Sequence, residues 1–179
     1  MGQLTQGIMD FARVDGSNQV HDVLNLNEVI DALTFDLRLQ DDQLCIESDL
    51  ASIQFDTVNL RRVIENLVGN AVKYHDGVRP MKIIVAVHAT GCRCHVTVTD
   101  NGPGIDLRFH KKIFEVFQSL SLSDTPESTG IGLSIVKRAI ERNGGEISIN
   151  SDVGRGSTFS FDWPISLEIN GTQEESRAA

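Results

Sequence analysis

The chain has 179 residues, of which 40% are hydrophobic, and a formal net charge of −9 at pH 7. This length suits one well-packed domain with an appendage, and the hydrophobic fraction is too high for a disordered chain. The acidic balance argues against nucleic acid or an anionic membrane as partner, because both need an extended basic surface. Three cysteines give no even disulfide framework, and there is no signal peptide or membrane-spanning run, so a cytoplasmic protein is expected.

The first third of the chain predicts two helices and two strands. Apolar residues at helical spacing predict a short helix over 4–14. A second helix is expected over 28–40, with Asn27 as its N-cap. Residues 43–48 and 52–56 then predict two strands paired across a short turn.

The rest of the chain alternates between helical and strand patterns. The expected elements are a helix over 57–74, a hairpin of strands over 81–89 and 92–100, a short helix over 111–117, a helix over 131–143, and strands over 146–152 and 157–164. Helices combined with mainly hairpin-linked strands predict the α+β class, as a two-layer α/β sandwich. Its mixed, mostly antiparallel sheet would be covered on one face by helices.

A polar stripe runs along the long helix of residues 57–74. At about 100° per residue, Asn66, Asn70 and Lys73 line up away from the apolar face. Asparagine is a poor helix-interior residue, because its amide competes for backbone hydrogen bonds. The stripe therefore indicates either a solvated surface or a polar cavity. In a cavity, Asn70 would ligate Mg²⁺ through its carbonyl oxygen and Lys73 would meet phosphate as a point charge.

A glycine-rich turn follows the strand that ends at Asp100, in the stretch VTVTDNGPGID of residues 96–106. A calcium loop is excluded, because Gly102 and Gly104 stand where ligand oxygens are needed. A plain turn fits the pattern. A base-recognition site fits it too, with the Asp100 carboxylate accepting a hydrogen bond from an exocyclic amine and the glycines leaving bare backbone beneath the base.

A second glycine-rich stretch, TGIGL at residues 129–133, leads directly into a helix. Small residues and free N–H groups at a helix start can cradle phosphate, although an ordinary loop with a glycine cap gives the same pattern. No Gly-Lys-Ser/Thr follows, so the stretch is not a Walker A loop. The long polar segment before it carries Phe114 and Phe117, which would pack a short helix on the domain. Such a segment is also consistent with a lid over a nucleotide.

Taken together, these motifs resemble the ATP-binding domain of sensor histidine kinases, in the family that includes the gyrase, Hsp90 and MutL ATPases. NLVGNAVKY at 66–74 resembles the N box, DNGPGID at 100–106 the G1 box, KIFEVF at 112–117 the F box and TGIGL the G2 box. GRGSTFSFDWP at 154–164 is similar to the closing strand of the family. The resemblance implies the Bergerat fold with a flexible ATP lid.

The resemblance also implies the site, with ATP and Mg²⁺ as cofactors. Asn70 would hold Mg²⁺, and Asn66 and Lys73 would act on the phosphates as catalytic residues. Asp100 would bind the adenine amine. The other implied binding residues are Tyr74, Gly102, Gly104, Ile105, Phe117, Thr129, Gly130, Ile131, Gly132, Leu133 and Thr158. Chemistry would be phosphoryl transfer by positioning and charge neutralisation.

The resemblance divides the chain into three parts. Residues 1–18 would be the end of a dimerisation helix and a linker, 19–165 the catalytic domain and 166–179 a disordered tail. The phosphoacceptor histidine is expected on an upstream dimerisation domain, which would make the full protein a homodimer, and a response regulator would be a further partner. The chain alone is expected to bind ATP without efficient autophosphorylation. Whether the full protein is membrane-anchored stays open.

Two other functions fit the same motifs. A degenerate module would bind nucleotide only to change its shape or partner, and intact motifs argue against it. An ATPase clamp of the gyrase or Hsp90 kind would carry a catalytic glutamate at the position of Asn66, whereas here Glu65 stands one residue away. Outside the motifs, Cys92 and Cys94 are expected on a buried strand face, and His75 at a solvent-facing helix end.

Overall fold

The computed structural model describes residues 21–48, 53–116 and 130–164. The elements in chain order are β1 His21–Leu24, α2 Leu26–Asp36, β2 Leu44–Ser48, β3 Ile53–Asp56, α3 Thr57–Lys73, β4 Ile83–Thr90, β5 Arg93–Asp100, the 3₁₀ turns η1 Leu107–Phe109 and η2 Lys112–Phe114, α4 Gly132–Arg142, β6 Ile147–Asp152 and β7 Gly156–Pro164. The predicted helix over 4–14 and the predicted tail lie outside the described residues.

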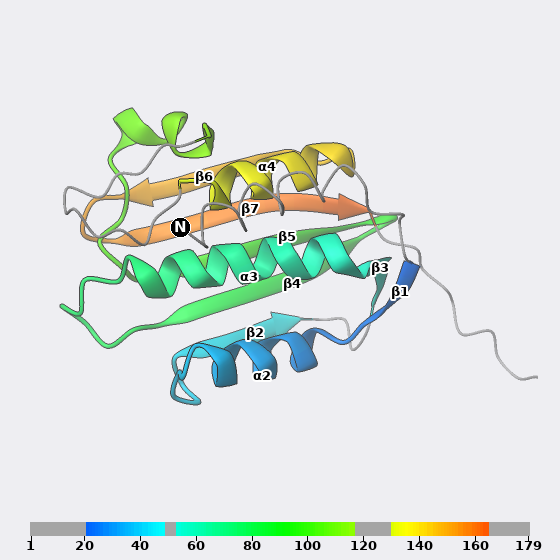
Figure 1. The fold of residues 1–179 in the computed structure, drawn as a ribbon, viewed down its shortest axis with the longest axis horizontal. Coiled ribbons are helices and arrows are strands. Elements are labelled where there is room, and N and C mark those ends of the chain that lie inside the picture. The colour runs from blue at the N-terminus through cyan, green and yellow to red at the C-terminus, as the bar shows by residue number, and fades with distance from the viewer. Residues whose placement is uncertain (1–20, 49–52, 117–129, 165–179) are drawn as a thin grey trace, which may run out of the picture.

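Five strands form one sheet in the order β2-β4-β5-β7-β6, and the three α-helices lie on one of its faces (Figure 1). All neighbours in this sheet are antiparallel except β2 and β4. The predicted two-layer α+β class, with a mixed and mostly antiparallel sheet, is confirmed.

The core lies between the helices and the sheet, because alternate strand residues point to the helical face. The buried residues of β4, β5 and β7 on this face are Ile83, Val85, Val87, Cys94, Val96, Val98, Phe159, Phe161 and Trp163. Helix α3 covers them with an apolar stripe of Leu60, Val63, Ile64, Leu67 and Val68. Burial raises the pKa of the Cys94 thiol to about 12, so this cysteine is a packing residue.

Three local predictions are wrong. The N-cap of α2 is Asn25, whose side chain accepts from the N–H of Asn27, so the helix starts earlier than expected. Strands β2 and β3 do not pair with each other. Strand β2 pairs in parallel with β4, and β3 forms a small antiparallel pair with β1 (Figure 1). Cys92, expected on a buried strand face, is exposed because β5 begins at Arg93.

Candidate functional site

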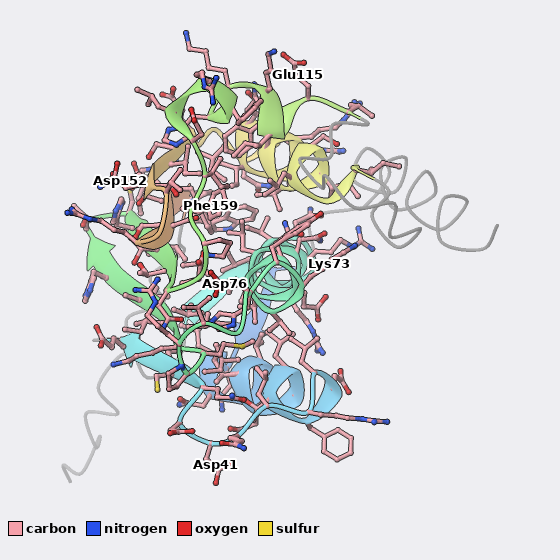
Figure 2. All side chains as sticks on the ribbon, turned by 90° about the vertical axis from the view of Figure 1, so that its left-hand side faces the viewer. Asp41, Lys73, Asp76, Glu115, Asp152 and Phe159 are labelled. Carbon is pink, nitrogen blue, oxygen red and sulfur yellow. The ribbon has the colours of Figure 1, made fainter. Side chains whose placement is uncertain are left out.

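Three of the predicted motifs meet at one end of the two layers. The last turns of α3, the loop between β5 and η1, and the start of α4 all lie at the left-hand end of Figure 1. Figure 2 looks at this end, with Lys73 on the helix side, Asp152 on the sheet side and Phe159 between the layers. The sequence thus brings residues from three separate stretches to one site.

Asp100 is half-buried at the end of β5. Its Oδ1 accepts a hydrogen bond of 2.8 Å from the backbone N–H of Gly102. Burial raises the pKa of this carboxyl, while hydrogen bonds from Gly102 and from the backbone and hydroxyl of Ser157 oppose the rise, as does nearby His75. Asp100 is therefore held in place by its own loop and by the neighbouring strand β7.

The two glycines of this loop are required by close contacts. Gly104 has a φ of +71°, and a Cβ there would overlap the backbone carbonyl oxygen of Asp152. At Gly102, a Cβ would lie 2.9 Å from Asp100 Oδ1 and disturb the hydrogen bond that orients the carboxylate. Neither position accepts a side chain without movement of its neighbours.

Arg79 braces the loop from outside. Its Nη2 atom donates to the backbone carbonyls of Asn101 at 2.8 Å, Gly102 at 3.2 Å and Gly154 at 3.0 Å. The Asn101 amide adds two bonds of 2.8 Å to the backbone of residues 80 and 82. Arg79 was not predicted from the sequence, because it lies between the motifs and no spacing signal marks a side chain that binds distant carbonyls.

Ser157, rather than Thr158, faces the site. Ser157 lies opposite Asp100 in the strand register, on the face that also carries Phe159. Thr158 points to the other face, where its hydroxyl lies 3.1 Å from that of Thr99. Strand alternation counted from the apolar Phe159 would have identified Ser157 from the sequence.

A serine pair extends this brace to the next part of the loop. The backbone N–H of Ile105 donates to Ser151 Oγ at 2.8 Å, and Ser151 Oγ lies 3.0 Å from Ser157 Oγ. Ser151 also donates to the carbonyl of Gly156 at 2.8 Å. The loop from Asp100 to Ile105 is therefore tied to both strands β6 and β7.

The amide of Asn66 on α3 lies against the start of α4. Its Nδ2 donates to the carbonyl of Arg62 at 2.8 Å, and its Oδ1 lies 3.0 Å from where a Cβ on Gly132 would stand. Helix α4 has no side-chain cap at its N-cap residue, Ile131, so its first N–H groups have no side-chain acceptor there. A Cβ at position 132 would require the Asn66 amide to shift by a few tenths of an ångström.

The remaining residues of the stripe lie toward the open end of α3. Asn70 is half-buried, and Lys73 is exposed with its Nζ 5.7 Å from the centre of the Tyr74 ring. At the start of α4, Gly130 has a φ of +63° and Leu133 is partly buried. Ile131 is only 2% exposed and belongs to the hydrophobic core.

The segment after the G1 box folds differently from the prediction. Two 3₁₀ turns, η1 and η2, replace the single short helix expected over 111–117. Phe114 packs edge-on against Phe159 with ring centroids 6.3 Å apart, as a packing role requires. Phe117 and Thr129 lie outside the described residues.

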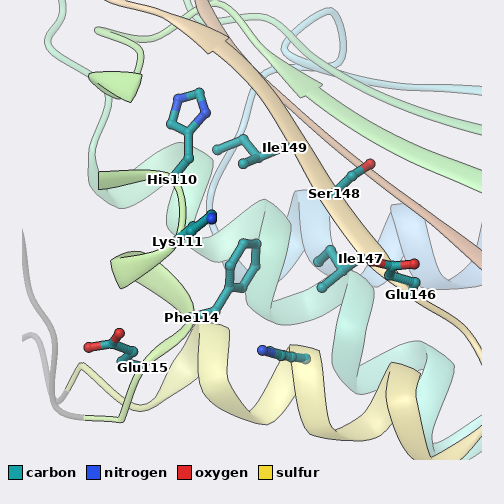
Figure 3. A pocket seen from close by; sticks show the side chains of 9 residues that line it. His110, Lys111, Phe114, Glu115, Glu146, Ile147, Ser148 and Ile149 are labelled. Carbon is teal, nitrogen blue, oxygen red and sulfur yellow. The ribbon is translucent and has the colours of Figure 1, made fainter. Parts of the chain in front are cut away.

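A cavity of about 530 Å³ lies beside this segment, between η2, α4 and the edge strand β6 (Figure 3). It is lined by Lys111, Phe114, Lys137, Glu146 and Ile149, among others, and by none of the predicted site residues. Within the described ranges, no group of three or more His, Cys, Asp or Glu side chains could hold a metal ion. No helix of those ranges is long and apolar enough to span a membrane.

Comparison with known proteins defines the class of this fold and site. Residues 55–167 match the family described as "Histidine kinase-, DNA gyrase B-, and HSP90-like ATPase". The chain belongs to this family, and its relatives are sensor histidine kinases, so it is an ATPase domain of the histidine kinase type.

Particular relatives agree with this assignment. The phytochrome-like protein Cph1 of Synechocystis sp. is 33% identical over 168 residues, which are 92% of this chain and 22% of that protein. The adaptive-response sensory kinase SasA of Prochlorococcus marinus subsp. pastoris is 38% identical over 132 residues, 72% of this chain and 35% of that kinase. The chain thus spans about a fifth to a third of the length of the curated relatives it matches.

Solved structures show the same fold. The nucleotide-free catalytic domain of the histidine kinase ThkA superposes with a TM-score of 0.65 at 28% identity, covering 81% of this chain and 95% of that one. Full-length ShkA in complex with AMPPNP superposes with a TM-score of 0.71 at 24% identity, covering 91% of this chain and 35% of ShkA, which is a likeness of fold.

Proposed function

We propose that this domain binds ATP with Mg²⁺ between α3, the loop of Asp100 and the start of α4, and transfers the γ-phosphoryl group to a histidine. The observation that carries the proposal is the approach of Asn66 Oδ1 to within 3.0 Å of the Cβ position at Gly132. It brings the polar stripe of α3 to the N-terminus of α4, where N–H groups and the helix dipole favour phosphate. ShkA, of similar fold, binds the ATP analogue AMPPNP.

The base end of the site recognises adenine. The Asp100 carboxylate would accept a hydrogen bond from the exocyclic amine, since its loop already fixes its orientation. Gly102 and Gly104 would let the base approach the backbone, and Ile105 and Tyr74 would pack beside it. Ser157 would support Asp100 through its hydrogen bonds, a role that was predicted from the sequence for Thr158.

The phosphate end uses the backbone of Gly130, Ile131, Gly132 and Leu133, together with Lys73 as a cation. Neutral amide oxygens and few carboxylates suit Mg²⁺, which keeps several waters and is held mainly by substrate phosphates. Asn70 would supply the protein ligand and Asn66 would orient the phosphates. Bound Mg²⁺ would neutralise phosphate charge during transfer. The assignments of Phe117 and Thr129 stay predictions.

The acceptor histidine would lie on a dimerisation domain of the same kinase, with a response regulator as the next partner in the cytoplasm. An ATPase clamp is the weaker alternative, because its glutamate has no counterpart at the position of Asn66. Glu65 accepts a 2.7 Å hydrogen bond from Arg61 on the helix surface, one turn away along α3.

Mixing this chain with a separately produced, histidine-bearing dimerisation domain of the same kinase and Mg²⁺-ATP tests the proposal. We expect phosphohistidine on the added domain and little phosphate on this chain alone. ATP binding without transfer would support the regulatory module, and steady phosphate release would support the clamp. Asn70→Ala should reduce transfer by about 100-fold, as expected for loss of a group that positions the phosphates. Asn150→Ala, an exposed asparagine on β6, is the matched control and should transfer normally.

A further inference from the structure

His75 lies just after α3. It was expected to face solvent, but it is partly buried. Its backbone N–H bonds the carbonyl of Val72 at 3.4 Å, and its Nδ1 accepts from the N–H of Gly77 at 3.1 Å. An imidazole nitrogen that accepts carries no proton, so the ring proton lies on Nε2. The turn thereby fixes both the orientation of the ring and its tautomer.

The Nε2 atom of His75 is buried and has no hydrogen-bond partner in the described part of the chain. A buried donor without a partner is costly, so such an atom calls for an explanation. Among the histidines of this region, His110 does have a partner, since its Nε2 lies 3.0 Å from the carbonyl oxygen of Ile105.

His75 stands beside the proposed base site. A Cβ on Gly102 would lie 3.9 Å from His75 Cα and 2.9 Å from Asp100 Oδ1, so Gly102 separates the two residues. His75 and Asp100 are also close enough to interact electrostatically. A carboxylate that accepts and an imidazole that donates therefore lie close together.

We propose that His75 is a second polar reader of adenine, donating from Nε2 to the ring nitrogen next to the amine that Asp100 binds. The adenine amine lies between two ring nitrogens that accept hydrogen bonds, N1 and N7. An acceptor such as Asp100 beside a donor such as His75 can therefore pair with the amine and with either ring nitrogen. In guanine an O6 acceptor replaces the amine and would face the Asp100 carboxylate. The inference rests on the proposed nucleotide site and makes His75 a residue that determines base specificity.

Two substitutions separate base contact from support of the turn. His75→Asn keeps an acceptor near the position of Nδ1 for Gly77 and removes the distal donor. His75→Gln places an amide donor near the position of Nε2 and loses the acceptor. We expect ADP affinity to fall about 10-fold in H75N and to stay within about 3-fold in H75Q, as the loss of one hydrogen bond predicts. The reverse order would assign His75 to the turn and overturn the proposal.

Deaza analogues identify the atom contacted. Calorimetric titration of the chain with ADP, 1-deaza-ADP and 7-deaza-ADP should show about 10-fold weaker binding of one analogue to the wild type and to H75Q. H75N should bind that analogue and ADP with equal affinity, because the substitution and the analogue remove the same hydrogen bond. If the losses of affinity from H75N and from the analogue add, the inference about His75 is wrong, although nucleotide binding itself still stands. Failure of the wild type to bind ADP would instead refute the proposed function. If H75N does not fold, the retained discrimination of H75Q decides.

Discussion

The base end and the phosphate end of this site are built in different ways. At the base end, Asp100 and its loop are held by hydrogen bonds from Gly102 within the loop, from Ser157 on β7 and from Arg79, which also binds the turn at Gly154. At the phosphate end, the side chain of Asn66 donates to the carbonyl of Arg62 in its own helix. One end is thus fixed before ligand binds, and the other is set by the placement of two helices.

This difference predicts which substitutions affect folding stability and which affect only ligand binding and transfer. At the base end, changes that remove a hydrogen bond of the loop should affect folding stability and nucleotide binding together, because the same bonds serve both. A change of Asn66 at the phosphate end should affect binding and transfer with little effect on stability, since its hydrogen bond stays within its own helix.

The largest effect on stability is expected for Gly104→Ala. The residue has a φ of +71°, and the new Cβ would overlap the carbonyl oxygen of Asp152, which no rotamer can relieve. The free energy of unfolding should fall by about 3 kcal/mol or more in urea titrations. Gly91→Ala is the control, with a φ of +60° and open space, and should cost only about 1 kcal/mol. Equal losses in the two variants would show that the loop is not tightly packed.

Asp100→Asn should be the strongest change in binding alone. Its Oδ1 can still accept from Gly102, but an amide NH₂ would then face the adenine amine, and two donors cannot pair. ADP affinity should fall about 100-fold by calorimetry, while the free energy of unfolding changes by less than about 1 kcal/mol. Asp31→Asn, an exposed aspartate on α2, should change neither quantity. Unchanged affinity in D100N would refute the adenine assignment.

The sequence predicted the parts of the site that rest on local patterns. Helix α3, the β4–β5 hairpin, the closing β6–β7 pair and the glycine loop at Asp100 all follow from periodicity and turn chemistry over a few residues. The α3 stripe and the glycine start of α4 could therefore be placed on their elements without a structure.

What the sequence did not predict depends on long-range geometry. The pairing of β2 with β4 crosses α3 in sequence, so no hairpin signal marks it, and β2 was paired with β3 instead. Arg79 acts on carbonyls 22 to 75 residues away. The buried Nε2 of His75 depends on a turn that folds back toward Gly102, whereas the sequence showed only a histidine after a helix.

Arg79→Ala tests whether the base end is braced from outside. Removal of one guanidinium takes a donor from three backbone carbonyls, so we expect a loss of about 1–2 kcal/mol in the free energy of unfolding and about 5-fold in ADP affinity. Arg79→Lys keeps the charge without the planar fork and should lose most of the same free energy. A fully stable R79K would show that charge, and not the hydrogen bonds, holds the loop.

Ser157→Ala should have the smallest effect, visible mainly as a shift with pH. Burial already raises the pKa of Asp100, and the Ser157 hydroxyl opposes that rise, so its removal raises the pKa further. Since only the ionised carboxylate accepts from adenine without donating, the pH below which ADP affinity falls should be higher in S157A than in the wild type.

Folding stability should respond in the opposite direction to pH. The folded carboxyl binds its proton more tightly than the unfolded one, so the Asp100 contribution to stability is greatest below the ordinary aspartate pKa and is lost as pH rises through the raised one. In S157A the loss of folding stability with rising pH should extend to higher pH and be larger. Ser160→Ala, on the other face of β7, is the control and should leave both pH profiles unchanged. Coincident profiles for S157A and wild type would show that the base end does not depend on this serine.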